Sequence, residues 1–126
     1  MTIRTLFRSR LPLFAVLALC FVAPGLLAQD PVTTNPKIVK VKFENDRVRV
    51  LEAISKPGEK ELMHSHPANI LYVVEGGKLR MTTADGKTTD VELKTGDTLW
   101  REPVTHAAEN IGTTTFHAII VEMKKP

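Results

Sequence analysis

From residue 29 to residue 126, no segment of this chain has a helical periodicity sustained over ten or more residues. The segment consists instead of short runs rich in β-branched and apolar residues, separated by turn signals, a pattern typical of strands. About seven to nine strands at such regular spacing predict an all-β domain: a sandwich, a barrel or a jelly roll. We expect strands at 38–43, 47–51, 71–74, 78–83, 88–93, 98–100 and 116–123.

Turn residues connect these runs. Asp85 and Gly86 lie between 78–83 and 88–93, and both tolerate the positive φ of a tight hairpin turn, so we predict a hairpin there. Further turns are predicted at Lys56-Pro57-Gly58, Gly76-Gly77 and Thr95-Gly96-Asp97. We find no second domain, no internal repeat and no low-complexity segment.

The first 28 residues have the composition of a targeting segment rather than of the folded domain. Three arginines precede an apolar run over 11–27, and the small residue Ala28 closes it. This is the order of a secretory signal peptide, so we predict a signal peptide at 1–28 and a mature chain from Gln29. Residues 29–37 contain two prolines and read as an extended N-terminal lead-in to the domain at 38–126.

Two other interpretations of the N-terminal segment remain open. An uncleaved membrane anchor is one, because a run of about 17 apolar residues just reaches across a bilayer. A lipoprotein modified at Cys20 is the other, although Leu19 is larger than the residue that such a site prefers. We expect a periplasmic or secreted bacterial protein, free of the membrane once the signal is removed. Its mature form then has no cysteine and no disulfide.

Removal of the signal also changes the net charge. The chain has 17 lysines and arginines against 14 aspartates and glutamates, and Arg4, Arg8 and Arg10 lie in the signal. The mature chain therefore carries 14 residues of each sign and a formal net charge of zero. A neutral surface gives no support for a nucleic-acid partner.

The pair His64 and His66 is the most informative local pattern. On a strand, residues i and i+2 point to the same face, so two imidazoles can converge on one metal ion. The spacing alone also fits two polar residues at a solvated strand edge. The residues around the pair decide between these interpretations.

Two longer motifs frame the histidines. Gly58, five residues, His64-Ser65-His66 and then the run Tyr72 to Gly76 form the first. Gly96-Asp97, then Pro103, His106 and Asn110 form the second. Together they resemble the two motifs of the cupin superfamily, and over about 43–122 the chain is similar to small single-domain cupins. The resemblance implies a cupin-type double-stranded β-helix, or jelly-roll barrel, at 38–126, with His64, His66 and His106 as metal ligands in one barrel mouth.

The chain also departs from these motifs. Cupins usually carry a glutamate ligand a few residues after the second histidine, and residues 67–71 contain no acid. Asn69 is the candidate fourth ligand in its place. His117 lies in an apolar strand and is a candidate for orienting another ligand rather than for binding the metal itself. The charged residues Arg101, Glu102 and Glu109 are expected at the solvated surface.

A site of three histidines predicts a divalent transition metal. We expect zinc or copper by default, with iron, manganese or nickel also possible. Residues 1–10 contain no Arg-Arg pair, so the chain is expected to fold after export and to bind the metal that has the highest affinity.

Three functions remain open: a metal-dependent enzyme on a small organic substrate, a non-catalytic module that binds a small molecule or metal, and a dimeric scaffold. The family resemblance also implies a homodimer.

Overall fold

The computed structural model describes residues 29–126, so the predicted signal peptide and its cleavage site lie outside the described residues. Within this range the all-β prediction is confirmed. One short helix, α1 (Pro31–Thr34), precedes nine strands. These are β1 (Val39–Glu44), β2 (Val48–Ser55), β3 (Lys60–His66), β4 (Asn69–Glu75), β5 (Gly77–Thr83), β6 (Thr88–Leu93), β7 (Thr98–Arg101), β8 (Val104–Asn110) and β9 (Phe116–Met123).

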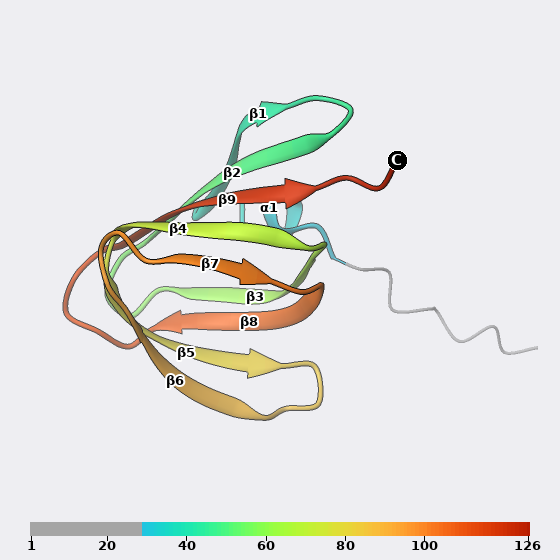
Figure 1. The fold of residues 1–126 in the computed structure, drawn as a ribbon. Coiled ribbons are helices and arrows are strands. Elements are labelled where there is room, and N and C mark those ends of the chain that lie inside the picture. Colours follow the sequence, from blue (N-terminus) through green and yellow to red (C-terminus); the bar gives the residue numbers. More distant parts are fainter. Residues whose placement is uncertain (1–28) are drawn as a thin grey trace, which may run out of the picture.

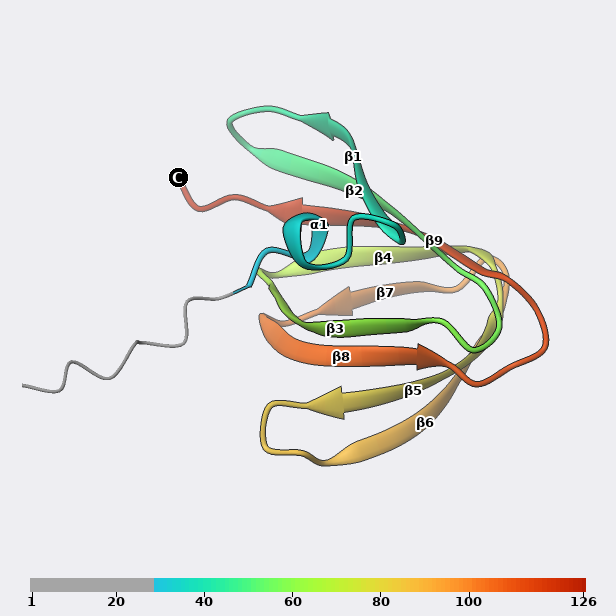
Figure 2. The same ribbon diagram turned by 180° about the vertical axis from the view of Figure 1, so that it is seen from behind.

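The strands form two antiparallel sheets that lie face to face. One sheet has the order β1-β2-β9-β4-β7 and the other has the order β3-β8-β5-β6. Figure 1 shows the two layers, and Figure 2 shows the same arrangement from behind, with α1 on the near side, where it contacts β3 and β1. This is the double-stranded β-helix, or jelly-roll barrel, that the sequence predicts.

The core lies between the sheets because each strand alternates its side chains. Along β9, Phe116, Ala118 and Ile120 are at most 5% exposed, and the residues between them face outward. Leu51 on β2 and Val73 on β4 are fully buried against the same interior. The apolar core therefore forms the inner lining of the barrel.

Part of the outer face of the five-stranded sheet is also apolar. Trp100 on β7 is 57% exposed and Tyr72 on β4 is 45% exposed. In the register of this sheet Trp100 lies beside Ile70, and Ile70 lies beside Val121. An uncharged apolar row therefore crosses three neighbouring strands on the outside of the barrel.

The N-terminal segment differs from the extended lead-in that we predicted. Asp30 caps α1 by accepting hydrogen bonds from the backbone N–H groups of Val32 and Thr33, and Pro31 occupies the first turn. An aspartate followed by proline is a good helix start, which our reading of the prolines overlooked. Among residues 29–126, no helix is long and apolar enough to cross a membrane.

The hairpin between β5 and β6 is confirmed, but its turn differs from the predicted one. Only Gly86 has a positive φ, of 83°, and no non-glycine residue in the described range does. Asp85 instead accepts a hydrogen bond from the backbone N–H of Lys87 and one from the Thr83 hydroxyl. The aspartate therefore stabilises the turn through its side chain, without a left-handed backbone.

Asn110, at the end of β8, supplies a testable contribution to stability. It is 1% exposed, its amide donates to the carbonyls of Ser55 and Thr114, and its oxygen accepts from the Gly112 N–H. Asn110→Ala leaves three backbone groups unpaired, so we expect a loss of about 2–3 kcal/mol in the free energy of unfolding. Urea denaturation measures it. Asn45→Ala, at an exposed turn, is the control and should cost clearly less; equal losses would contradict the assignment.

Candidate metal centre

The three predicted histidines meet inside one end of the barrel. His64 and His66 come from β3, His106 comes from β8, and His64 is paired with His106 across the two strands. All three are buried, with exposures of 0%, 4% and 5%. One nitrogen from each lies within 4.8 Å of the others, so the group could hold a metal ion. The convergence predicted from the spacing and the motifs is confirmed.

A backbone carbonyl fixes the orientation of His64. The Nδ1 atom of its ring lies 2.7 Å from the oxygen of Leu62. A carbonyl oxygen only accepts, so Nδ1 of the neutral ring carries the proton and donates it. The lone pair of Nε2 is then left to bind a metal.

A buried carboxylate fixes the orientation of His66. Its Nδ1 lies 2.6 Å from Oε1 of Glu122, and Glu122 also accepts a hydrogen bond from Nε of Arg49 at 2.7 Å. Burial alone would raise the pKa of Glu122, but these two hydrogen bonds outweigh it, and the pKa lies below its ordinary value. Glu122 is therefore an anion at neutral pH and holds Nδ1–H of His66, an arrangement common behind metal-binding histidines.

These two anchors bring the Nε2 atoms of His64 and His66 to 3.0 Å from each other. When both rings are neutral, with the proton on Nδ1, both Nε2 atoms carry lone pairs, and two lone pairs at this distance repel unless a cation lies between them. Two nitrogen ligands at ~2.0–2.1 Å from one metal ion lie about 2.9 Å apart at a right angle and about 3.4 Å apart at the tetrahedral angle. The observed separation falls within this range, so the donor set fits a transition metal.

Burial keeps the imidazoles in the form that binds metal. It lowers the pKa of His64, and it lowers that of His106 to about 3, with the charges of His64 and Arg101 acting in the same direction on His106. Both rings are neutral at physiological pH. Ligation of a metal therefore displaces no proton from either of them near neutrality.

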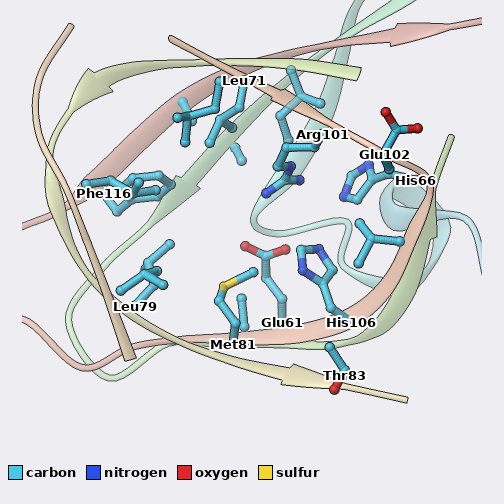
Figure 3. A pocket seen from close by; sticks show the side chains of 18 of the residues that line it. Glu61, His66, Leu71, Leu79, Met81, Thr83, Arg101, Glu102, His106 and Phe116 are labelled. Carbon is cyan, nitrogen blue, oxygen red and sulfur yellow. The ribbon is translucent and has the colours of Figure 1, made fainter. Parts of the chain in front are cut away.

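Glu61 is a residue of this site that our reading of the sequence missed. Its Oε2 lies 3.5 Å from Nε2 of His64, and its carboxylate points into the barrel beside His106 (Figure 3). Residues three apart on a regular strand face opposite sides, but the pairing of β3 with β8 shifts register between Glu61 and His64. This bulge turns Glu61 to the side of the histidines. A carboxylate is thus present beside the site, from the residues before the first histidine rather than after the second.

Asn69 and Arg101 lie on the opposite sheet and face the histidines. They are paired between β4 and β7, and the Asn69 amide oxygen accepts a hydrogen bond from Nε of Arg101 at 3.3 Å. Asn69 is fully buried, and its role as a fourth ligand stays a prediction. The surface position expected for Arg101 is wrong: its guanidinium points into the barrel (Figure 3). Arg101 therefore belongs to the polar end of the interior.

The structure does not bring His117 to the other histidines. It alternates with Phe116 and Ala118 and so faces outward, where its Nε2 lies 3.1 Å from Oε1 of Glu52. The role of orienting a ligand, which we predicted for His117, belongs to Glu122 and to the Leu62 carbonyl. The alternation along β9 could have indicated Glu122, because it shares the inward face with Ile120.

A cavity of roughly 470 Å³ extends from the histidines along the barrel interior. His66, His106, Glu61 and Arg101 line its polar part, and Phe116 lies at the opposite end (Figure 3). The remaining wall is largely apolar and includes Leu71, Leu79, Met81, Val91, Leu93, Leu99, Ala118 and Ile120. This volume lies in the range of small-molecule sites.

Comparison with known families agrees with the fold and the histidine cluster. The sequence matches the cupin domain family over residues 51–122, which is more than half of the chain. The protein belongs to the cupin superfamily. No functionally curated protein matches it in sequence.

Solved structures of several bacterial proteins are similar to this one. A cupin domain from Bordetella pertussis is 29% identical, with a TM-score of 0.64 over 70% of this chain and 93% of its own. A conserved double-stranded β-helix protein from Klebsiella pneumoniae is 27% identical, with a TM-score of 0.56 over 68% and 70% of the two chains. A cupin-like protein from Thermotoga maritima is also 27% identical, with a TM-score of 0.53 over 67% and 65%.

The ligand assignment predicts a graded set of zinc affinities. Replacing His64, His66 or His106 singly with alanine should weaken zinc binding on the order of a hundredfold or more, since each removes a ligand. Glu122→Gln should weaken it about 10- to 100-fold through the orientation of His66. His117→Ala, on the outer face, should leave the affinity unchanged. Competition titration with a chromogenic chelator measures all five proteins.

Acid should release the metal only at a pH below the ordinary pKa of imidazole. Because burial lowers the pKa values of His64 and His106, protons compete with the metal for these two ligands only below the ordinary imidazole pKa of about 6.5. Loss of affinity already at pH 7, or His117→Ala as damaging as His64→Ala, would contradict the assignment.

Proposed function

We propose that this chain is an exported cupin that holds one divalent transition metal on His64, His66 and His106 and acts there on a small organic substrate. The observation that carries the proposal is the 3.0 Å contact between the Nε2 lone pairs of His64 and His66 at the end of an interior cavity. A metal there makes the contact favourable, and the cavity gives a ligand access to it.

In this proposal different side chains of the protein bind the metal and transfer protons. His64, His66 and His106 provide three neutral nitrogen ligands, and three protein ligands leave positions for substrate or water. A bound metal would supply Lewis acidity at those positions. Glu61 lies beside them, and burial raises its pKa to about 7, so the carboxyl group can give or take a proton near neutrality.

Zinc or copper is the proposed metal, with iron, manganese or nickel as the other occupants that imidazoles accept. Three neutral imidazoles suit zinc and copper, and the intrinsic order of affinities favours these two ions when a chain folds outside the cytosol. Glu61 adds an oxygen donor near the three nitrogens. Such a donor favours iron more than a purely nitrogenous site does.

A non-catalytic binding module is the second candidate. The observation that favours it is the cavity wall, which is apolar over most of its area and offers Glu61 as the main group able to transfer a proton. A protein with this lining can retain a small apolar molecule without transforming it.

We further propose that the protein is a homodimer through the outer face of the five-stranded sheet. Exposed Trp100 lies there in a row with Ile70 and Val121, and exposed Tyr72 lies in the next row, beside Thr98 and Ile119. In a two-fold dimer the same surface patch of both copies meets itself. The row of Trp100, Ile70 and Val121 can do so without repulsion between like charges. Burial of these aromatic side chains would supply the association energy.

The proposed function is tested on protein purified from the exported fraction of its native cells. N-terminal sequencing should begin at Gln29, and elemental analysis should find about one equivalent of a transition metal per chain. A full-length cytosolic protein would contradict export. Less than about a tenth of an equivalent, even after incubation with each candidate ion, would contradict the metal site.

Assays of turnover then distinguish a metal-dependent enzyme from a non-catalytic binding module. Oxygen uptake and ester hydrolysis are followed on a panel of small organic compounds. Turnover that disappears in His64→Ala but persists in His117→Ala supports the enzyme. Retention of a compound by the metal-loaded protein, without turnover, supports the binding module instead.

A further inference from the structure

Arg101 stands out among the residues that line the cavity because it is the one lysine or arginine side chain in the lining. It comes from the edge strand β7, and the pairing of this strand with β4 points it inward beside Asn69. The apolar residue Leu99, two positions earlier on β7, lines the same wall. A charged guanidinium has therefore been placed in an otherwise largely apolar interior, at a cost in desolvation.

The protein provides hydrogen-bond partners for only part of the Arg101 guanidinium. Its Nε donates to the Asn69 oxygen, and among residues 29–126 neither terminal nitrogen has a hydrogen-bond or ion-pair partner. Glu61 faces it across the cavity (Figure 3) and opposes the lowering of its pKa by burial, yet the two groups form no ion pair. Arg49, on the same sheet, shows the contrast: it pairs with both Asp30 and Glu122.

The cavity is polarised along its length. The polar end carries Arg101, Glu61 and the histidines, and the opposite end is closed by Phe116 (Figure 3). Between them lie the rows of Ile120 and Ala118, and β9 extends roughly 13 Å from Phe116 to Ile120 at the usual strand rise. A ligand that fills this space has an apolar body and a polar head at one end.

We propose that Arg101 binds the carboxylate head of an apolar monocarboxylic acid whose body occupies the barrel cavity. This inference rests on the proposed function, since it names the ligand class of the same cavity. With Nε bonded to Asn69, the two terminal nitrogens of the planar guanidinium form one free edge that matches a carboxylate with two parallel hydrogen bonds. Asn69 acts as a positioning residue, because its oxygen holds Nε and leaves the terminal nitrogens facing the cavity.

The charge of the site favours an anion over a neutral or cationic head. The three histidines are neutral donors, so a divalent metal on them adds two positive charges to that of Arg101. Glu61 removes at most one of these charges, and Glu102, at the rim, is exposed and accepts a hydrogen bond from the Trp100 indole. The carboxylate would thus lie between Arg101 and the metal centre, where both attract it.

Binding of octanoate, octanol and octylamine by calorimetry tests this inference, in zinc-loaded and in metal-free protein. The three probes share one apolar chain and differ in the charge of the head. We expect octanoate to bind at least about tenfold more tightly than octanol, and octylamine to bind weakest, since charge-assisted hydrogen bonds are about twice as strong as neutral ones.

Variants of Arg101 test whether its guanidinium binds the carboxylate. Arg101→Gln should lose about ten- to a hundredfold in octanoate affinity while octanol binding stays unchanged, and Arg101→Lys should retain part of the preference. Arg80→Gln removes the same charge from an exposed pair with Asp90 and should change nothing. The unfolding midpoint and zinc stoichiometry of each variant establish that it is folded.

The outcomes separate this inference from the proposed function. Equal affinity for octanoate and octanol, no binding of either, or a preference that survives Arg101→Gln would overturn the role of Arg101, even if one zinc binds. An Arg101-dependent preference in protein that binds no metal would support Arg101 while contradicting the metal centre.

Discussion

The contact between Nε2 of His64 and Nε2 of His66 is the constraint on which the rest of the site depends. Two neutral imidazoles would normally turn one N–H toward the other's lone pair, but here each Nδ1 already donates, to the Leu62 carbonyl and to Glu122. Both lone pairs are therefore held toward one point, 3.0 Å apart, in a buried environment. A cation shared by the two nitrogens would make this unfavourable arrangement favourable.

The barrel supplies the anchors through the register of its larger sheet. Arg49 lies beside Glu122, Glu122 lies beside Asn69, and Asn69 lies beside Arg101, so one polar row crosses four strands. Glu122 in this row orients His66, and Arg101 at its end faces the cavity. A single row thus orients His66 on one side and presents the Arg101 cation to the cavity on the other. The apolar rows below it provide the ligand-sized space.

The features that the sequence predicted well are those that depend on local patterns. The strands at 78–83, 88–93 and 116–123 match β5, β6 and β9 almost residue for residue, because alternation and turn residues act over a few positions. The i, i+2 spacing placed His64 and His66 on one face for the same reason. His106 required the family motif, because nothing local to it shows that β8 pairs with β3.

The missed residues depend on pairing between distant strands. Glu61 faces the histidines only because a bulge shifts the register of β3 against β8, and strict alternation places it on the other side. Arg101 faces inward because β7 pairs with β4, and its charge suggested the surface instead. The position of His117, by contrast, could have been predicted from the sequence, since alternation with Phe116 and Ala118 indicates the outer face directly.

X-ray absorption at the zinc edge of the zinc-loaded protein tests ligation by the three histidines, because it reports the ligand atoms themselves. The account predicts three imidazole nitrogens at about 2.0–2.1 Å, with the remaining shell made of oxygen. His66→Ala should remove one imidazole from this shell, and His117→Ala should remove none. A shell of oxygen atoms with fewer than two imidazoles in the unmodified protein would contradict the account.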